Sequence, residues 1–169
     1  MSDDTDSFDC NDASLNEYLK RYALKNQERH MYGVTYVALP TEAKVKILGY
    51  YTVSNCTIPR GGLPEHLTKG QPKYNEIPAL LLGRLAVDKD LRGTGIGHAL
   101  MAHCLDMALN VAKWSGARYL ITDAYDATIS WYERYNFRAM VGSNSMLLTK
   151  MYVDLKVVRE ARLAVIPEA

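Results

Sequence analysis

The segment that most restricts the fold of this chain is a glycine-rich turn, Arg92-Gly93-Thr94-Gly95-Ile96-Gly97, between two apolar segments. The segment before it, Ala79–Val87, is almost continuously apolar, which predicts a central strand buried on both faces. After it, apolar residues recur at helical spacing as far as Ser115-Gly116, which predicts a helix packed on the sheet. A strand, a glycine turn and a helix in this order leave the backbone open to close approach by a ligand.

The same turn predicts a phosphate site. Its glycines let several amides point outward together, and the start of the helix adds unsatisfied amides and the positive end of a dipole. Arg92 can add a charge-assisted contact. A Walker loop is excluded because His98 follows Gly97, and a dinucleotide fingerprint lacks the glycine at its sixth position. A tight turn without any ligand remains the alternative.

The remaining patterns complete a mixed α/β (α+β) layout, which we expect to form a mostly antiparallel sheet flanked by helices. A capping box at Ser14–Glu17 predicts a helix to about Asn26, with Leu15, Leu19, Tyr22, Ala23 and Asn26 on the face towards the core. The other predicted elements are a hairpin of 34–39 and 45–54 with its turn at 40–43, a long loop at 57–78, strands at 117–122 and 146–157, and a helix at 128–135. Alternation along the second hairpin strand places Tyr50 and Tyr51 on opposite faces. We expect a single domain over residues 1–169, with 1–7 as a possible tail and 157–169 as either a helix or a tail.

Composition narrows the class of protein. The chain has 169 residues, 48% of them hydrophobic and 23% charged, with a formal charge of +1, which argues against disorder and against nucleic-acid binding by bulk charge. Its three cysteines, Cys10, Cys56 and Cys104, lie too far apart for a disulfide framework or a zinc site, and we expect no metal. The acidic N-terminus and the lack of a long apolar run predict a cytoplasmic protein without a membrane segment.

The motif Arg92-x-x-Gly95-x-Gly97, with Leu85-Ala86-Val87 before it and a helix after it, resembles the signature of the GNAT acetyltransferases. The resemblance implies the GNAT acyl-CoA N-acyltransferase fold and acetyl-CoA as cosubstrate. Backbone amides of Arg92, Gly93, Thr94, Gly95, Ile96 and Gly97 would hold the pyrophosphate, while Leu85, Ala86 and Val87 would pair with the pantetheine arm. The amide at Val87 would polarise the thioester carbonyl, an effect of about 3–4 kcal/mol.

A second segment, Trp131-Tyr132-Glu133-Arg134-Tyr135-Asn136-Phe137, resembles the aromatic-Tyr-x-x-Tyr/Phe-Gly-Phe segment of the same family. By that resemblance Tyr132 is the general acid that protonates the departing thiolate of coenzyme A. The alternative is a tyrosine that only packs in a helix. Asn136 stands where glycine is usual, and we expect the turn to survive because asparagine tolerates left-handed angles. The turn at 123–126 is one residue shorter than in relatives.

Three further segments resemble the GNAT toxins of toxin–antitoxin pairs. They are Phe8-Asp9-Cys10 with the first helix, Gly49-Tyr50-Tyr51-Thr52-Val53-Ser54 and Pro78–Asp88, and together the matched segments span most of residues 8–155. The resemblance implies that the protein acetylates the amino group of aminoacyl-tRNA and so blocks translation. It also implies a ribbon-helix-helix antitoxin as partner, and a homodimer.

Basic residues give modest support for an RNA substrate. Lys20, Arg21, Lys25 and Arg29 gather near the first helix, where they contact phosphates or simply solvate the helix. Arg84 lies in an apolar strand and needs a partner, so it is either a paired structural charge or part of the site. No protein base is demanded, because an aminoacyl ester has a lowered amine pKa.

Two other functions remain open. The same cofactor site would serve a GNAT enzyme that acetylates a small amine or a protein N-terminus. A non-catalytic module that binds coenzyme A or a protein partner would keep the fold without using Tyr132.

Overall fold

The computed structural model describes residues 4–40, 46–144 and 147–165. The chain forms two compact units, one of Met1–Ser54 with Leu82–Asp106 and one of Asn55–Leu81 with Met107–Ala169. The six strands follow the order β1-β2-β3-β4-β6-β5. Pairs β1–β2, β4–β6 and β5–β6 are antiparallel and β3–β4 is parallel, which confirms the predicted mixed, mostly antiparallel sheet with helices. That the chain is a single domain stays a prediction.

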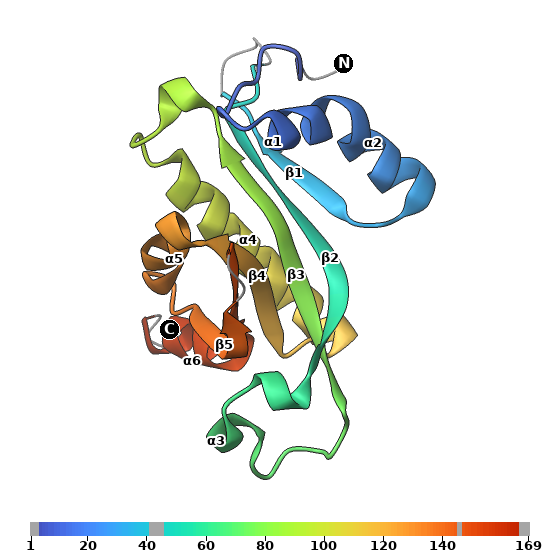
Figure 1. Cartoon of the computed structure of the whole chain (residues 1–169), viewed down its shortest axis with the longest axis vertical. Coiled ribbons are helices and arrows are strands. Elements are labelled where there is room, and N and C mark those ends of the chain that lie inside the picture. Colours follow the sequence, from blue (N-terminus) through green and yellow to red (C-terminus); the bar gives the residue numbers. More distant parts are fainter. Residues whose placement is uncertain (1–3, 41–45, 145–146, 166–169) are drawn as a thin grey trace. The chain divides into compact units, whose positions relative to one another are not determined.

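Figure 1 labels the elements along the chain. The strands are β1 (Val34–Ala38), β2 (Gly49–Pro59), β3 (Glu76–Val87), β4 (Tyr119–Tyr125), β5 (Arg138–Asn144) and β6 (Leu148–Asp154). The helices are α1 (Ala13–Glu17), α2 (Ala23–Lys25), α3 (Glu65–Thr68), α4 (Ile96–Ser115), α5 (Asp126–Glu133) and α6 (Leu155–Val165). Two π-helical turns, Tyr18–Tyr22 and Asn26–His30, continue α1 and α2, and short 3-10 turns lie at Arg60–Gly62 and Lys89–Leu91.

The first helix differs from its prediction at both ends. Asp12, not Ser14, caps it, because the Asp12 carboxylate accepts hydrogen bonds from the amides of Ser14 and Leu15. The helical run then continues to His30 and ends at Met31 in the left-handed conformation, with φ 55°. Its π-helical turns shift the register, so that Tyr18 is buried whereas Tyr22, expected to face the core, is 46% exposed.

In the first unit, strand β2 presents its two tyrosines to opposite faces, as predicted. Tyr50 packs in a core with Phe8, Tyr18 and Ala86, whereas the Tyr51 hydroxyl bonds to the Nδ1 atom of His103 on α4 at 2.7 Å. Gly49 lies so close to β3 and α4 that an added Cβ would stand 2.8 Å from the Ala86 carbonyl oxygen and 2.9 Å from the Leu100 side chain.

In the second unit, β4 and β6 pair antiparallel from Tyr119–Asp154 to Tyr125–Leu148. The adjoining core contains Ile58, Ile77, Tyr119, Ile121, Met140 and Tyr152, which come from strands β2 to β6. Helix α5 begins directly after β4, so no separate turn remains at 123–126. The prediction of a turn at these residues was therefore wrong.

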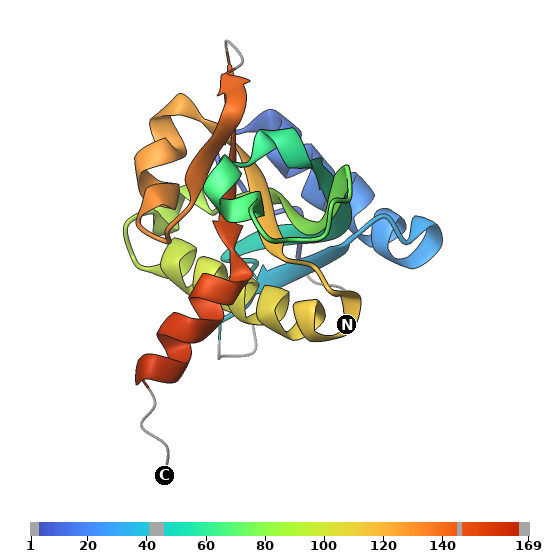
Figure 2. The same ribbon diagram turned by 90° about the horizontal axis from the view of Figure 1, so that it is seen from below.

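Several boundaries were predicted wrongly. The loop expected at 57–78 is shorter, because β2 continues to Pro59 and β3 begins at Glu76, with α3 between them. Strand β5 was missed, and the last strand is followed by helix α6, so the possible tail at 157–169 is helical as far as Val165 (Figure 2). The predicted turn at 41–43 lies outside the described residues. Across the described ranges, the structure has no helix that is both apolar enough and long enough to cross a membrane.

Candidate active site

The glycine-rich turn leads from β3 into α4 within the first unit. Gly93 and Gly95 have φ values of 80° and 95°, and nothing lies within 4 Å of a Cβ added at either. These glycines are therefore required by the backbone conformation and not by crowding. The Ala99 amide donates to the Gly95 carbonyl at 3.0 Å, and the amides of Ile96 and Gly97 belong to the first turn of α4, where the helix itself supplies no acceptor. This geometry fits an anionic phosphate group.

Ion pairs and hydrogen bonds hold the segment that precedes the glycine-rich turn. The buried Asp88 carboxylate accepts a hydrogen bond from the Asp90 amide at 3.1 Å and forms an ion pair with Lys46 at 3.3 Å. Lys89 donates to Asp9 at 2.9 Å, and this bond is the main reason that the pKa of Asp9 lies well below its ordinary value. The Phe8-Asp9-Cys10 segment is thus tied to the turn that precedes the glycines.

Arg92 has a structural role that the sequence did not reveal. Its side chain is exposed overall, but one guanidinium nitrogen donates to the carbonyl oxygen of Cys10 at 2.5 Å. This contact braces the N-terminal segment against the turn. The Arg92 backbone amide stays in the predicted turn, whereas its guanidinium is partly committed to the protein.

The end of β3 presents the residues expected to meet the cofactor. The Ala86 side chain is buried in the core with Tyr50, whereas Leu85 and Val87, which point to the other face, are half-buried. The parallel pairs of β3 with β4 run from Ala79–Tyr119 to Leu81–Ile121, and β3 continues beyond them to Val87.

Arg84 is partnered by an aromatic ring. Its guanidinium carbon lies 3.7 Å from the centroid of the Tyr18 ring, which itself stacks near Tyr50. Within the described ranges, no carboxylate or carbonyl accepts a hydrogen bond from this guanidinium. The charge is therefore positioned by a cation–π contact while its planar set of donors stays available. Tyr18 was not predicted as a site residue, since nothing local links it to a residue so far along the chain.

Tyr132 lies on α5 in the second unit. Its side chain is 8% exposed, and its ring meets those of Trp131 and Phe137 edge to face, with centroids 5.0 and 5.5 Å apart. Asn136 adopts φ 63°, and its amide bonds to the Glu133 carbonyl at 3.0 Å, which confirms that the turn forms with asparagine in place of glycine. The structure thus holds the Tyr132 ring in one orientation.

The basic residues of the first helical run are exposed, and they differ in their contacts within the protein. Arg21 pairs with Glu17 at 3.4 Å, and the Lys20 ammonium donates to the Asp6 carbonyl oxygen at 2.9 Å. Lys25 and Arg29 are exposed. Two members of the predicted patch are therefore engaged within the protein, which weakens the patch as a phosphate site.

One further aromatic contact was not found from the sequence. Tyr36 stacks on Tyr51 with centroids 5.0 Å apart, and burial raises the pKa of Tyr51 strongly. The three cysteines are free thiols, and no group of three His, Cys, Asp or Glu side chains in the described part of the chain could hold a metal ion.

The sheet order and the strand–glycine turn–helix arrangement define a mixed α/β protein with a candidate phosphate site at the turn. A family model described as an acetyltransferase (GNAT) domain matches residues 35–139, more than half of the chain. The chain therefore belongs to the GNAT acetyltransferase family.

One related protein and two solved structures are similar to most of this chain. The tRNA-acetylating toxin of Mycobacterium tuberculosis (strain ATCC 25618 / H37Rv) is 27% identical over 137 residues, which cover 80% of this chain and 79% of that protein. The structure of AtaT complexed with acetyl-methionyl-tRNAfMet has a TM-score of 0.86 and 25% identity, covering 95% of this chain and 92% of that one. The structure of AtaTR bound with AcCoA has a TM-score of 0.79 and 26% identity, covering 95% and 91%.

Proposed function

We propose that this protein transfers the acetyl group of acetyl-CoA to the amino group of aminoacyl-tRNA and so blocks translation. The observation that carries the proposal is the similarity, over 95% of the chain, to a structure that holds an acetylated aminoacyl-tRNA. The similarity to the tRNA-acetylating toxin, of which 79% is covered, points in the same direction.

The cofactor site is assigned to the turn and to the end of β3. The amides of Arg92, Gly93, Thr94, Gly95, Ile96 and Gly97 bind the pyrophosphate of acetyl-CoA, and the open space around Gly93 and Gly95 supports this assignment. Leu85, Ala86 and Val87 pair with the pantetheine arm. The Val87 amide donates to the thioester carbonyl oxygen and stabilises the negative charge that develops there.

Tyr132 acts as the general acid. A phenol with its ordinary pKa near 10 is protonated at neutral pH, so its hydroxyl can donate a proton to the leaving thiolate. The edge-to-face contacts with Trp131 and Phe137 support this role, because they fix the ring that carries the hydroxyl.

Arg84 binds the tRNA acceptor end. Its guanidinium is held over Tyr18 with its hydrogen-bond donors available, an arrangement suited to a phosphate or ester oxygen. Lys25, Arg29, Lys20 and Arg21 contact phosphates farther along the RNA, the last two after giving up their present partners. The attacking amine needs no protein base, because the neighbouring ester lowers its pKa.

The partners follow from the same resemblance. We infer a ribbon-helix-helix antitoxin that neutralises the protein, a homodimer, and a cytoplasmic location where charged tRNA is found. Co-expression of the neighbouring gene product, followed by measurement of the mass of the purified complex, tests the first two together.

The experiment that tests the proposed function is transfer of radiolabelled acetyl from acetyl-CoA to one of four acceptors: charged tRNA, deacylated tRNA, free amino acids, or peptides with open N-termini. Label on charged tRNA alone supports the proposal. Label on the free amines or peptides with none on charged tRNA would replace the RNA substrate with a small amine or a protein N-terminus. If acetyl-CoA binds but no acetyl group reaches any acceptor, the protein would be a non-catalytic module that binds coenzyme A.

A further inference from the structure

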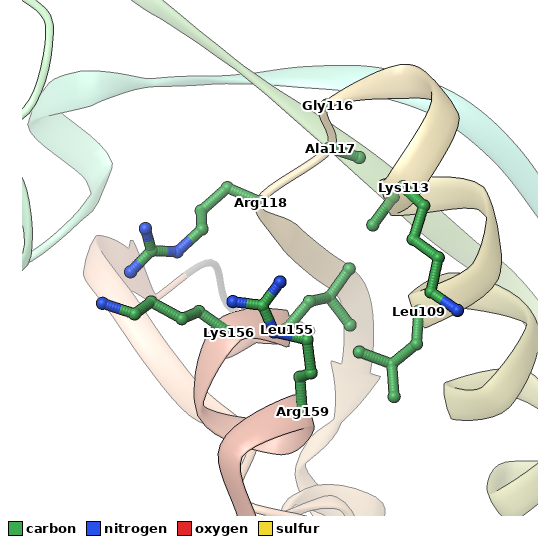
Figure 3. A pocket seen from close by; sticks show the side chains of 9 residues that line it. Leu109, Lys113, Gly116, Ala117, Arg118, Leu155, Lys156 and Arg159 are labelled. Carbon is green, nitrogen blue, oxygen red and sulfur yellow. The ribbon is translucent and has the colours of Figure 1, made fainter. Parts of the chain in front are cut away.

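A pocket of about 230 Å³ lies in the second unit, between the C-terminal turn of α4 and the first turn of α6 (Figure 3). Four cationic side chains line it: Lys113 from α4, Arg118 before β4, and Lys156 and Arg159 from α6. Leu109 and Leu155 add apolar wall. In the close-up, the cationic groups of Arg118 and Lys156 extend to the same side of the pocket, and the Arg159 guanidinium points back across it.

The pocket carries net positive charge. Arg118 is neutralised by Asp154 through two hydrogen bonds of 2.7 and 2.8 Å, and Lys156 approaches Glu160 at 3.7 Å. Within the part of the chain that the structure describes, no carboxylate pairs with Lys113 or Arg159, and the one described partner of Lys113 is the Asn110 side-chain oxygen at 3.3 Å. Two cations therefore remain uncompensated around one cavity, which favours an anionic ligand.

The walls of the pocket are held in place before any ligand binds. Asp154, which is 8% exposed, accepts a hydrogen bond from the Lys156 amide at 2.8 Å and so caps α6 as well as holding Arg118. The Leu155 amide donates to the Arg118 carbonyl oxygen at 3.0 Å. On the facing side, Gly116 ends α4 with φ 70°. A preorganised site loses less free energy in ordering its side chains when it binds.

The size and lining of the pocket fit a phosphodiester. One water molecule needs about 10–15 Å³ of such space, so the pocket of 230 Å³ accommodates a phosphate group with part of its sugar. Cations meet phosphate oxygens, while the leucine side chains offer apolar contact to a ribose. The family match ends at residue 139, so Lys156 and Arg159 lie outside the segment that carries the cofactor motif.

We propose that this pocket binds a backbone phosphate of the RNA substrate, with Lys113 and Arg159 as its main contacts. The proposal rests on the proposed function for the identity of the RNA. It adds a phosphate contact to those proposed for the first helix, where Lys20 and Arg21 also have protein partners.

The test is binding of deacylated tRNA to the full chain, without acetyl-CoA, over a series of salt concentrations. In the double variant Lys113→Gln, Arg159→Gln, the slope of log affinity against log salt should fall in magnitude by about 1.4–1.8, the contribution of two phosphate contacts. Affinity at 100 mM salt should fall roughly 10-fold or more. The variant Arg159→Lys, which keeps the charge, should retain most of the affinity.

The matched control is the double variant Lys69→Gln, Lys73→Gln, which removes two exposed charges from a loop of the same unit. Equal losses of tRNA affinity in the two double variants would mean that the effect comes from net charge alone, which would overturn the proposal. Unchanged tRNA binding in the pocket variant would also overturn it, and if the variant instead loses binding of a polyglutamate peptide, the pocket serves an acidic protein segment. Thermal unfolding of each variant verifies that the fold is retained.

The test of the pocket can fail without the test of the proposed function, because tRNA binding is measured in the absence of acetyl transfer. If the wild-type protein acetylates charged tRNA while the pocket variant binds tRNA normally, the pocket proposal fails alone. If tRNA binding depends on the pocket but no acetyl reaches charged tRNA, the proposed reaction fails and the pocket stands.

Discussion

The guanidinium of Arg84 lies 3.7 Å above the ring of Tyr18, a contact between a strand residue and a helix residue of the same compact unit. Substituting Arg84→Gln should lower kcat/KM for charged tRNA by about 10- to 100-fold, which corresponds to one charged hydrogen bond of about 1.5–3 kcal/mol. The dissociation constant of acetyl-CoA should stay unchanged.

Tyr18 provides the companion test of that contact. Tyr18→Phe keeps the ring under the cation and loses only a 3.4 Å contact with Thr35, so it should retain most of the activity. Tyr18→Leu removes the ring and should behave like Arg84→Gln. Equal activity in the leucine and phenylalanine variants would show that the ring does not position the charge.

Removing the hydroxyl of Tyr132 should affect chemistry and not binding. Tyr132→Phe keeps the ring contacts with Trp131 and Phe137, so we expect kcat to fall by about 10²- to 10⁴-fold with little change in KM. Tyr135→Phe is the matched control, since it removes a hydroxyl from the same segment and leaves the contact between its ring and Trp131. A loss of similar size in both variants would count against the general acid.

Backbone strain at the glycine turn should appear as weaker cofactor binding. Gly95 has φ 95° with open space around it, so Gly95→Ala adds strain of about 1–2 kcal/mol without a clash, and rotation of the peptide to relieve it moves the amides. Acetyl-CoA affinity, measured by calorimetry, should fall about 5- to 30-fold. Gly70→Ala, at φ 76° and also uncrowded, introduces the same strain elsewhere and should leave that affinity intact.

The buried thiol of Cys104 should make stability depend on alkaline pH. Burial raises its pKa to about 12, whereas the unfolded thiol has its ordinary pKa of about 8.5. The un-ionised thiol therefore contributes its full share to the free energy of unfolding below pH ~8.5. That share is lost as the pH rises towards the pKa of the thiol in the folded protein, at about 1.4 kcal/mol per pH unit.

Urea unfolding at pH 7.5 and 9.5 measures this dependence. The free energy of unfolding of the wild-type protein relative to Cys104→Ala should shrink by about 1.4 kcal/mol over that interval. A difference that stays constant with pH would mean that the thiol is accessible enough to ionise in the folded protein.

Local patterns in the sequence predicted the turn, the helix after it and the opposite faces of Tyr50 and Tyr51. These depend on spacing within one segment, so tertiary contacts change them little. The left-handed Asn136 was predictable for the same reason. Strand β5 was missed because Arg138–Asn144 mixes polar and apolar residues and includes Gly142 at φ 71°, which hides any alternation.

Features that join distant segments could not be predicted. The π-helical turns that bury Tyr18 and expose Tyr22 have no signature in residue type, and the contact of Tyr18 with Arg84 exists only after folding. The bond from Arg92 to the Cys10 carbonyl is of the same kind. The cationic pocket depends on α6, where the sequence left a helix and a tail equally open.

The most direct test of the central claim is to identify the acetylated atom. Charged tRNA is incubated with the protein and acetyl-CoA, the ester is cleaved by mild base, and the released amino acid is examined by mass spectrometry. The account predicts an N-acetyl amino acid with the native protein and very little with Tyr132→Phe. Unmodified amino acid in both reactions, under conditions where acetyl-CoA binds, would contradict it.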